Sequence, residues 1–132
     1  MNIFENYLSK INKVIRDNKD SLDLVNLDNL KNVNLEVPPD HFNFDLSTNV
    51  SLVLAKNNKL NPSNLAKNIK ELLLKNINHF EKIEIAGPGF INIKLSKEAV
   101  VLNINDILKN RNVFGAKKMN KIFNLEFVSA NP

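Results

Sequence analysis

A short hairpin pattern constrains the fold of this chain more than any other part of its sequence. Phe90-Ile91-Asn92-Ile93-Lys94-Leu95 alternates between the two sides of a half-buried strand. Ile83-Glu84-Ile85 precedes it, and Gly87-Pro88-Gly89 lies between them. Two such strands joined by a glycine-containing turn predict an antiparallel hairpin. Because side chains alternate across a strand, the three apolar residues of the second strand should face the core. The opposite face should carry Phe90, Asn92 and Lys94.

The rest of the chain predicts helices around a small sheet. Apolar residues recur at helical spacing over residues 2–18, and Asn61-Pro62 is a typical helix start. Ser47 or Thr48 could cap a helix that begins near Val50. A short strand is expected over residues 33–37, before Pro38-Pro39. Ser96 should begin a last helix, residues 97–110, with five apolar residues facing inward: Val100, Val101, Ile104, Ile107 and Leu108.

This order of elements predicts an α+β fold. We expect a small, mostly antiparallel sheet of about four strands, with helices packed on one face. A further strand is predicted near the C-terminal end, where an apolar run ends in Ser129-Ala130-Asn131-Pro132. We expect one domain over residues 1–112, followed by a connector and the first strand of a second domain over residues 113–132.

Composition narrows the classes of function. The chain has 132 residues, enough for one domain with a real core, and it has no cysteine. Disulfides and thiolate metal sites are therefore excluded. No apolar run approaches the length of a membrane span, and the N-terminus lacks the pattern of a signal peptide. We expect a cytoplasmic protein with no membrane partner.

Positive charge is concentrated in the second half of the chain. Residues 1–60 carry seven Lys/Arg and eight Asp/Glu, whereas residues 61–132 carry eleven and six. This asymmetry favours an anionic partner for the second half. A general bias toward Lys, Asn and Ile explains the basic pI of about 9.3 equally well.

The chain shows no pattern of catalytic residues. Its two histidines, His41 and His79, have no metal-ligand spacing, and each is expected to be a solvated or loop residue. Gly87-Pro88-Gly89 joins two strands, so it lacks the helix N-terminus of a phosphate-binding loop. We expect no catalytic residues, no metal and no cofactor in this chain.

Three stretches together resemble the additional N-terminal domain of bacterial arginyl-tRNA synthetases. The first runs from Phe44-Asp45-Leu46-Ser47-Thr48-Asn49-Val50 through Leu54-Ala55-Lys56 to Asn61-Pro62. The second is Ile85-Ala86-Gly87-Pro88-Gly89-Phe90-Ile91-Asn92-Ile93, and the third is Glu126-Phe127-Val128-Ser129-Ala130-Asn131-Pro132. The main departure from the family pattern is Phe44, which stands where the family usually has glycine; Ser51 in place of the usual alanine is a mild change. A bulky residue is unfavourable at a positive φ, so the local turn and the role of Asp45 could differ here.

The resemblance implies a role in tRNA recognition. In the family, the Ser-Ala-Asn-Pro segment leads into the ATP-binding motif of class I synthetases, which esterify arginine to tRNA. The expected partners are therefore arginine-accepting tRNA and the remainder of the synthetase, with ATP as the cofactor of the parent enzyme alone. The positions of Phe90 and Asn92 resemble the pair that receives a D-loop base. An aromatic ring can stack on such a base, and an amide can hydrogen-bond its edge.

Further tRNA contacts are expected near this pair and in the basic connector. The candidates are Gly87, Lys94, Lys109, Arg111, Lys117 and Lys118; Lys121 lies in the same connector. Lysine and arginine there could contact phosphates without regard to sequence, or the connector could be a solvated linker.

Two other functions compete with base recognition. A structural or protein-docking module of the synthetase would bury Phe90 and have an apolar or covered face around Asn92. A free-standing RNA-binding protein is disfavoured, because an uncovered apolar strand at residues 122–132 would invite aggregation.

Overall fold

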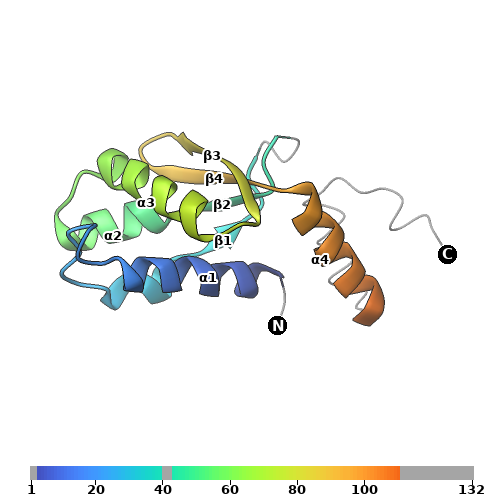
Figure 1. Cartoon of the computed structure of the whole chain (residues 1–132). Coiled ribbons are helices and arrows are strands. Elements are labelled where there is room, and N and C mark those ends of the chain that lie inside the picture. The colour runs from blue at the N-terminus through green and yellow to red at the C-terminus, as the bar shows by residue number, and fades with distance from the viewer. Residues whose placement is uncertain (1–2, 40–42, 111–132) are drawn as a thin grey trace.

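The computed structural model describes residues 3–39 and 43–110 (Figure 1). The first element is helix α1 (Ile3–Asp17), followed by the short 3-10 helix η1 (Asp28–Asn32). Two short strands, β1 (Leu35–Glu36) and β2 (Leu46–Thr48), come before helices α2 (Val50–Asn58) and α3 (Pro62–Asn76). The hairpin of β3 (Phe80–Ala86) and β4 (Phe90–Leu95) then leads into helix α4 (Lys97–Asn110).

The four strands of the described region form one antiparallel sheet in the order β1-β2-β4-β3. The predicted α+β class, with about four strands, is confirmed. Helices α1, α2 and α3 lie against one face of this sheet, as Figure 1 shows. Apolar side chains from the helices and strands join in a single core, which includes Tyr7, Ile11, Leu54, Ile69, Leu73, Ile83, Ile91 and Ile93.

Local sequence signals explain how α3 and the hairpin begin. The Asn61 side chain accepts a hydrogen bond from the Asn64 backbone N–H at 3.0 Å, and Pro62 occupies the first helical turn. In the hairpin turn, Gly87 has a φ of +56°, while proline fixes a negative φ at the next residue. A positive φ at the first central position alone is the pattern of a type II′ turn, whose twist matches that of the strands.

The sequence patterns did not predict strand β2 or the 3-10 helix η1. Strand β2 has three residues, and the last two, Ser47 and Thr48, were expected to cap the following helix. The expected cap is partly wrong for the same reason: Ser47 lies in β2 and Asn49 is the N-cap position of α2. The Thr48 hydroxyl still accepts a hydrogen bond from the Val50 N–H, at 3.3 Å.

Helix α4 has the predicted bounds but not the predicted packing. Among its described side chains only Ala99 is buried, whereas Val101, Leu102 and Leu108 are more than half exposed. Val100, Ile104 and Ile107 are partly exposed. Figure 1 shows the reason, because α4 continues past the end of β4, beyond the face that α1, α2 and α3 already cover.

Two expectations about the fold fall outside the described residues. These are the domain division after residue 112 and the strand near the C-terminal end.

Candidate nucleic-acid interface

The face of the sheet opposite the helices is built from alternate residues of β4. Ile91, Ile93 and Leu95 are buried, as predicted. Phe90 has 42% of its surface exposed, Lys94 is exposed and Asn92 is partly exposed. The aromatic ring and the amide therefore project from one face of a paired strand. A strand hydrogen-bonded on both sides holds such side chains more firmly than a loop.

Asn92 lies in the middle of a polar row that crosses all four strands. Its direct neighbours are Ser47 on β2 and Glu84 on β3, and Glu36 on β1 pairs with Ser47. The hairpin pattern implies that Glu84 lies opposite Asn92, a neighbour that the sequence analysis did not name. Ser47 was missed because the three-residue strand β2 was missed. Hydroxyl, amide and carboxylate groups side by side suit hydrogen bonds to the edge of a base better than a contact with phosphate.

Lysine side chains flank this row on one side. Lys94 pairs directly with Lys82 across the hairpin, and the Lys82 ammonium lies 3.6 Å from a carboxylate oxygen of Glu84. Both side chains of this ion pair are more than half exposed, so it contributes little to stability. The open face therefore carries the amide of Asn92 among charges of both signs, the carboxylates of Glu36 and Glu84 and the ammonium groups of Lys82 and Lys94.

The turn before Phe90 allows a close approach. A Cβ atom on Gly87 would meet no heavy atom within 4 Å, so its backbone is open to a ligand. Gly89 differs, because a Cβ there would lie 3.2 Å from the Cβ of Pro62. Gly89 thus allows the hairpin turn to pack against the start of α3.

Phe44, which stands where the family usually has glycine, has no positive φ. Among the described non-glycine residues only Asp23 and Lys59 have positive φ, so Phe44 does not adopt the conformation that would favour glycine. The Phe44 ring is buried, with the Lys82 ammonium 5.9 Å from its centroid. Beside it, the Asp45 carboxylate accepts a hydrogen bond from the Leu95 N–H at 2.8 Å. Burial raises the pKa of Asp45, and the Leu95 hydrogen bond opposes that rise.

His79 is more than a loop histidine. The Tyr7 hydroxyl lies 2.7 Å from its Nδ1, and the Asn103 amide donates to the same hydroxyl at 2.8 Å. This chain of hydrogen bonds ties α1 and the α3–β3 connection to α4. Burial, and then the charge of Lys10, lower the pKa of His79. His41 lies outside the described residues.

The structure brings together only part of the predicted tRNA-contact set. Gly87, Phe90, Asn92 and Lys94 share one turn and strand, whereas Lys109 is an exposed residue in the last turn of α4, away from the sheet (Figure 1). Arg111, Lys117 and Lys118 lie outside the described residues, as does Lys121. No cluster of metal-ligating side chains occurs in the described part of the chain. None of its helices is both long and apolar enough to cross a membrane.

Comparison with known proteins identifies the family. Residues 5–95 match the family model described as the arginyl tRNA synthetase N terminal domain. The chain belongs to this family. An arginine–tRNA ligase of Pelagibacter ubique is 42% identical over 137 residues, which cover the whole chain and 23% of that protein. The ligase of Bartonella quintana is 42% identical over 138 residues, again covering the whole chain and 23% of the relative.

A third relative has a shorter match. The arginine–tRNA ligase of Mesomycoplasma hyopneumoniae strain J is 47% identical over 88 residues, which cover 67% of this chain and 16% of that protein. The chain thus spans less than a quarter of the length of these curated relatives. The family assignment makes it an accessory domain of a synthetase.

Proposed function

We propose that this domain binds arginine-accepting tRNA and reads one unstacked D-loop base with Phe90 and Asn92. The ring of Phe90 stacks on the base, and the amide of Asn92 hydrogen-bonds its edge. The parent reaction is the ATP-dependent esterification of arginine to tRNA, which the rest of the ligase carries out. This domain contributes recognition, and we expect no charging of tRNA by residues 1–132 alone.

One observation carries the proposal: Phe90 is 42% exposed on the same strand face as Asn92. A large aromatic ring normally stabilises a small domain by being buried, so an exposed one on a rigid strand is available to a ligand. Base–aromatic stacking contributes about 1–3 kcal/mol of binding free energy per base. Lys94 lies two residues from Asn92 on the same strand face and pairs with Lys82, so positive charge is available near the pair, beside the carboxylate of Glu84.

The docking alternative fits the sheet face less well. It expects a buried Phe90 and an apolar surface, but the neighbours of Asn92 are Ser47 and Glu84. Three of the six exposed large apolar residues of the described region lie on α4: Val101, Leu102 and Leu108. We propose that α4 packs against the remainder of the ligase, which in the relatives is more than three times as long as this chain.

The test compares binding and folding in the same variants. Phe90→Ala should weaken binding of arginine-accepting tRNA by about 1–3 kcal/mol. It should change the free energy of unfolding by only about 0.5 kcal/mol, since an exposed side chain makes few contacts. Leu74→Ala is the matched control, because Leu74 is a 37% exposed apolar residue on α3, on the helix side of the sheet.

Fluorescence titration and urea denaturation measure the two quantities. If Phe90→Ala lowers stability by the ~3–5 kcal/mol of a core aromatic truncation and leaves tRNA affinity intact, the ring is a packing residue and the proposal fails.

A further inference from the structure

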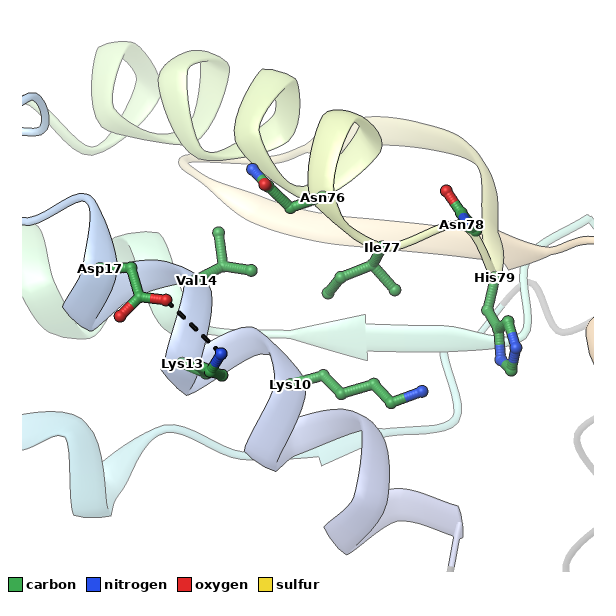
Figure 2. Close-up of a pocket in the computed structure, with 8 residues that line it drawn as sticks. All are labelled: Lys10, Lys13, Val14, Asp17, Asn76, Ile77, Asn78 and His79. Carbon is green, nitrogen blue, oxygen red and sulfur yellow. Dashed lines mark ion pairs between the residues drawn. The ribbon is translucent and has the colours of Figure 1, made fainter.

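An open groove lies on the helix side of the molecule, between α1 and the segment that leaves α3. It has a volume of about 460 Å³ and is lined by Lys10, Lys13, Val14, Asp17, Asn76, Ile77, Asn78 and His79. Figure 2 shows these side chains around the gap between the two segments. Phe90 and Asn92 lie on the opposite face of the sheet, so the groove is separate from the proposed base-reading site.

The charges divide the groove into two ends. The Lys13 ammonium lies 3.9 Å from a carboxylate oxygen of Asp17, the contact that is dashed in Figure 2. At this end a positive charge already has a counter-charge. At the other end Lys10 extends toward the ring of His79 (Figure 2), and its charge contributes to the lowered pKa of that ring.

The hydrogen bonds around His79 favour one tautomer of its neutral ring. The Asn103 amide nitrogen donates to the Ala99 carbonyl at 2.9 Å, and a carbonyl can only accept. The same nitrogen therefore donates to the Tyr7 hydroxyl oxygen, whose own proton is left to donate to Nδ1 of His79. The neutral ring then carries its proton on Nε2. The Nε2–H group of His79 is thus a hydrogen-bond donor on the side of the ring away from Tyr7, near the ammonium of Lys10.

The C-terminal end of α3 lies beside this end of the groove, but two of its carbonyl groups already accept hydrogen bonds. The last carbonyls of α3 would present partial negative charge. However, the Asn76 side chain donates to the Leu72 carbonyl at 2.8 Å, and the Ile77 N–H donates to the Leu73 carbonyl at 2.9 Å. Two side chains of α1 lie near the His79 ring: Tyr7, through its hydroxyl, and Lys10. The neutral amide of Asn103, on α4, donates to that Tyr7 hydroxyl.

We propose that the Lys10–His79 end of this groove binds a phosphate group. The ammonium of Lys10 and the Nε2–H of His79 donate to its oxygens; both residues line the groove. The phosphate is carried by an RNA backbone or is free in solution. This inference does not depend on base recognition by Phe90 and Asn92.

Binding of an anion next to the imidazole favours its protonated form. By linkage, a ligand that raises the pKa of His79 by one unit binds about tenfold more tightly to the protonated domain than to the neutral one. The pKa of His79 therefore reports occupancy of the site directly. Measurement of the imidazole signals by NMR gives this pKa, and loss of a signal in His79→Gln assigns it.

The experiment follows the pKa of His79 as inorganic phosphate is added at constant ionic strength, with chloride as the balancing anion. We expect a saturable rise of about one unit, because an opposite charge at hydrogen-bonding distance favours the charged imidazole. Lys10→Gln should abolish the rise, and Lys10→Arg should retain it because the cation is kept. Lys67→Gln is the matched control, because it removes one exposed positive charge from α3 outside the groove.

A second titration uses a short single-stranded RNA without terminal phosphates. If the RNA raises the pKa of His79 at a lower concentration of phosphate groups than inorganic phosphate does, the RNA backbone is the source. If only inorganic phosphate raises this pKa, the groove is a site for a free anion. The proposal is overturned if neither probe raises the pKa. It is also overturned if Lys10→Gln, shown by its amide spectrum to be folded, responds as strongly as Lys67→Gln. Loss of tRNA binding in Phe90→Ala with an unchanged His79 response would separate the two sites.

Discussion

At the scale of single residues, Tyr7 connects the most distant parts of the domain. The residue is only 1% exposed, and its hydroxyl contacts both His79 and Asn103, which are 72 and 96 residues away in the sequence. Burial raises the pKa of this phenol, so it remains a neutral donor and acceptor over the physiological range. A single hydroxyl thus fixes α4 and the α3–β3 connection against α1.

Tyr7→Phe keeps the ring and removes only these hydrogen bonds. We expect the free energy of unfolding to fall by about 1–2 kcal/mol, because Nδ1 of His79 and the Asn103 amide each lose a partner. Asn103→Ala should cost about 1 kcal/mol, and the double variant should cost less than the sum. Urea denaturation of the two single variants and the double variant measures the coupling. Strict additivity would show that the hydroxyl and the amide act independently.

Asp45 predicts a pH-dependent effect whose sign follows from burial. Its raised pKa means that the unfolded chain ionises first, near pH 3.8, so stability is lost as pH rises from there through the folded pKa. Asp45→Asn keeps an oxygen that accepts from the Leu95 N–H but cannot ionise. We therefore expect the melting temperature of Asp45→Asn, relative to the original chain, to be higher at pH 7 than at pH 3.5.

Asp45→Ala is the comparison for that prediction. It leaves the buried Leu95 N–H without its acceptor, which should cost about 1–3 kcal/mol at either pH. A melting temperature of Asp45→Asn that falls relative to that of the original chain as pH rises would reverse the assigned sign.

At the scale of helices and strands, the sequence predicts the elements with strong local signals. The six residues of β4 alternate, so both its bounds and its two faces follow from the pattern. Asn61-Pro62 likewise determines the start of α3. Strand β2 was missed because three residues carry too little periodicity, and its partners β1 and β4 are far away in the sequence. Glu84 could have been placed opposite Asn92 from the hairpin alone, whereas Ser47 required the sheet order.

Helix α4 shows the limit of periodicity in another way. A repeat of apolar residues indicates which side chains share a face, but it does not show whether anything covers them. In α4 the apolar residues after Ala99 remain exposed or half-exposed.

Few buried contacts imply low local stability for α4. We expect its amide hydrogens beyond Asn103 to exchange with solvent much faster than those in the middle of α3, where Leu65, Ala66, Ile69 and Leu73 are buried. Hydrogen-exchange NMR or mass spectrometry on this chain measures the difference. Equal protection in the two helices would mean that the exposed face of α4 is covered in solution.

At the scale of the whole molecule, the domain has two unlike sides. Helices α1, α2 and α3 close one face of the sheet (Figure 1), over a single core. The other face keeps polar side chains and the ring of Phe90 at the surface. This division lets the residues of the open face change without a loss of core packing. Substitutions on the open face should therefore change tRNA binding and leave stability unchanged, whereas core substitutions should lower stability. Measuring both quantities in the same variants tests the proposed function.

The most direct test of that function measures discrimination between bases. Arginine-accepting tRNA is prepared with each single-stranded D-loop base changed in turn, and binding to the original chain and to Asn92→Ala is measured by fluorescence titration. Asn68→Ala is the control, since it removes an exposed amide from α3 on the helix side. We expect one D-loop change to weaken binding of the original chain and of Asn68→Ala, but to have little further effect on Asn92→Ala. If Asn92→Ala discriminates among the D-loop bases as well as the original chain does, Asn92 does not read a base.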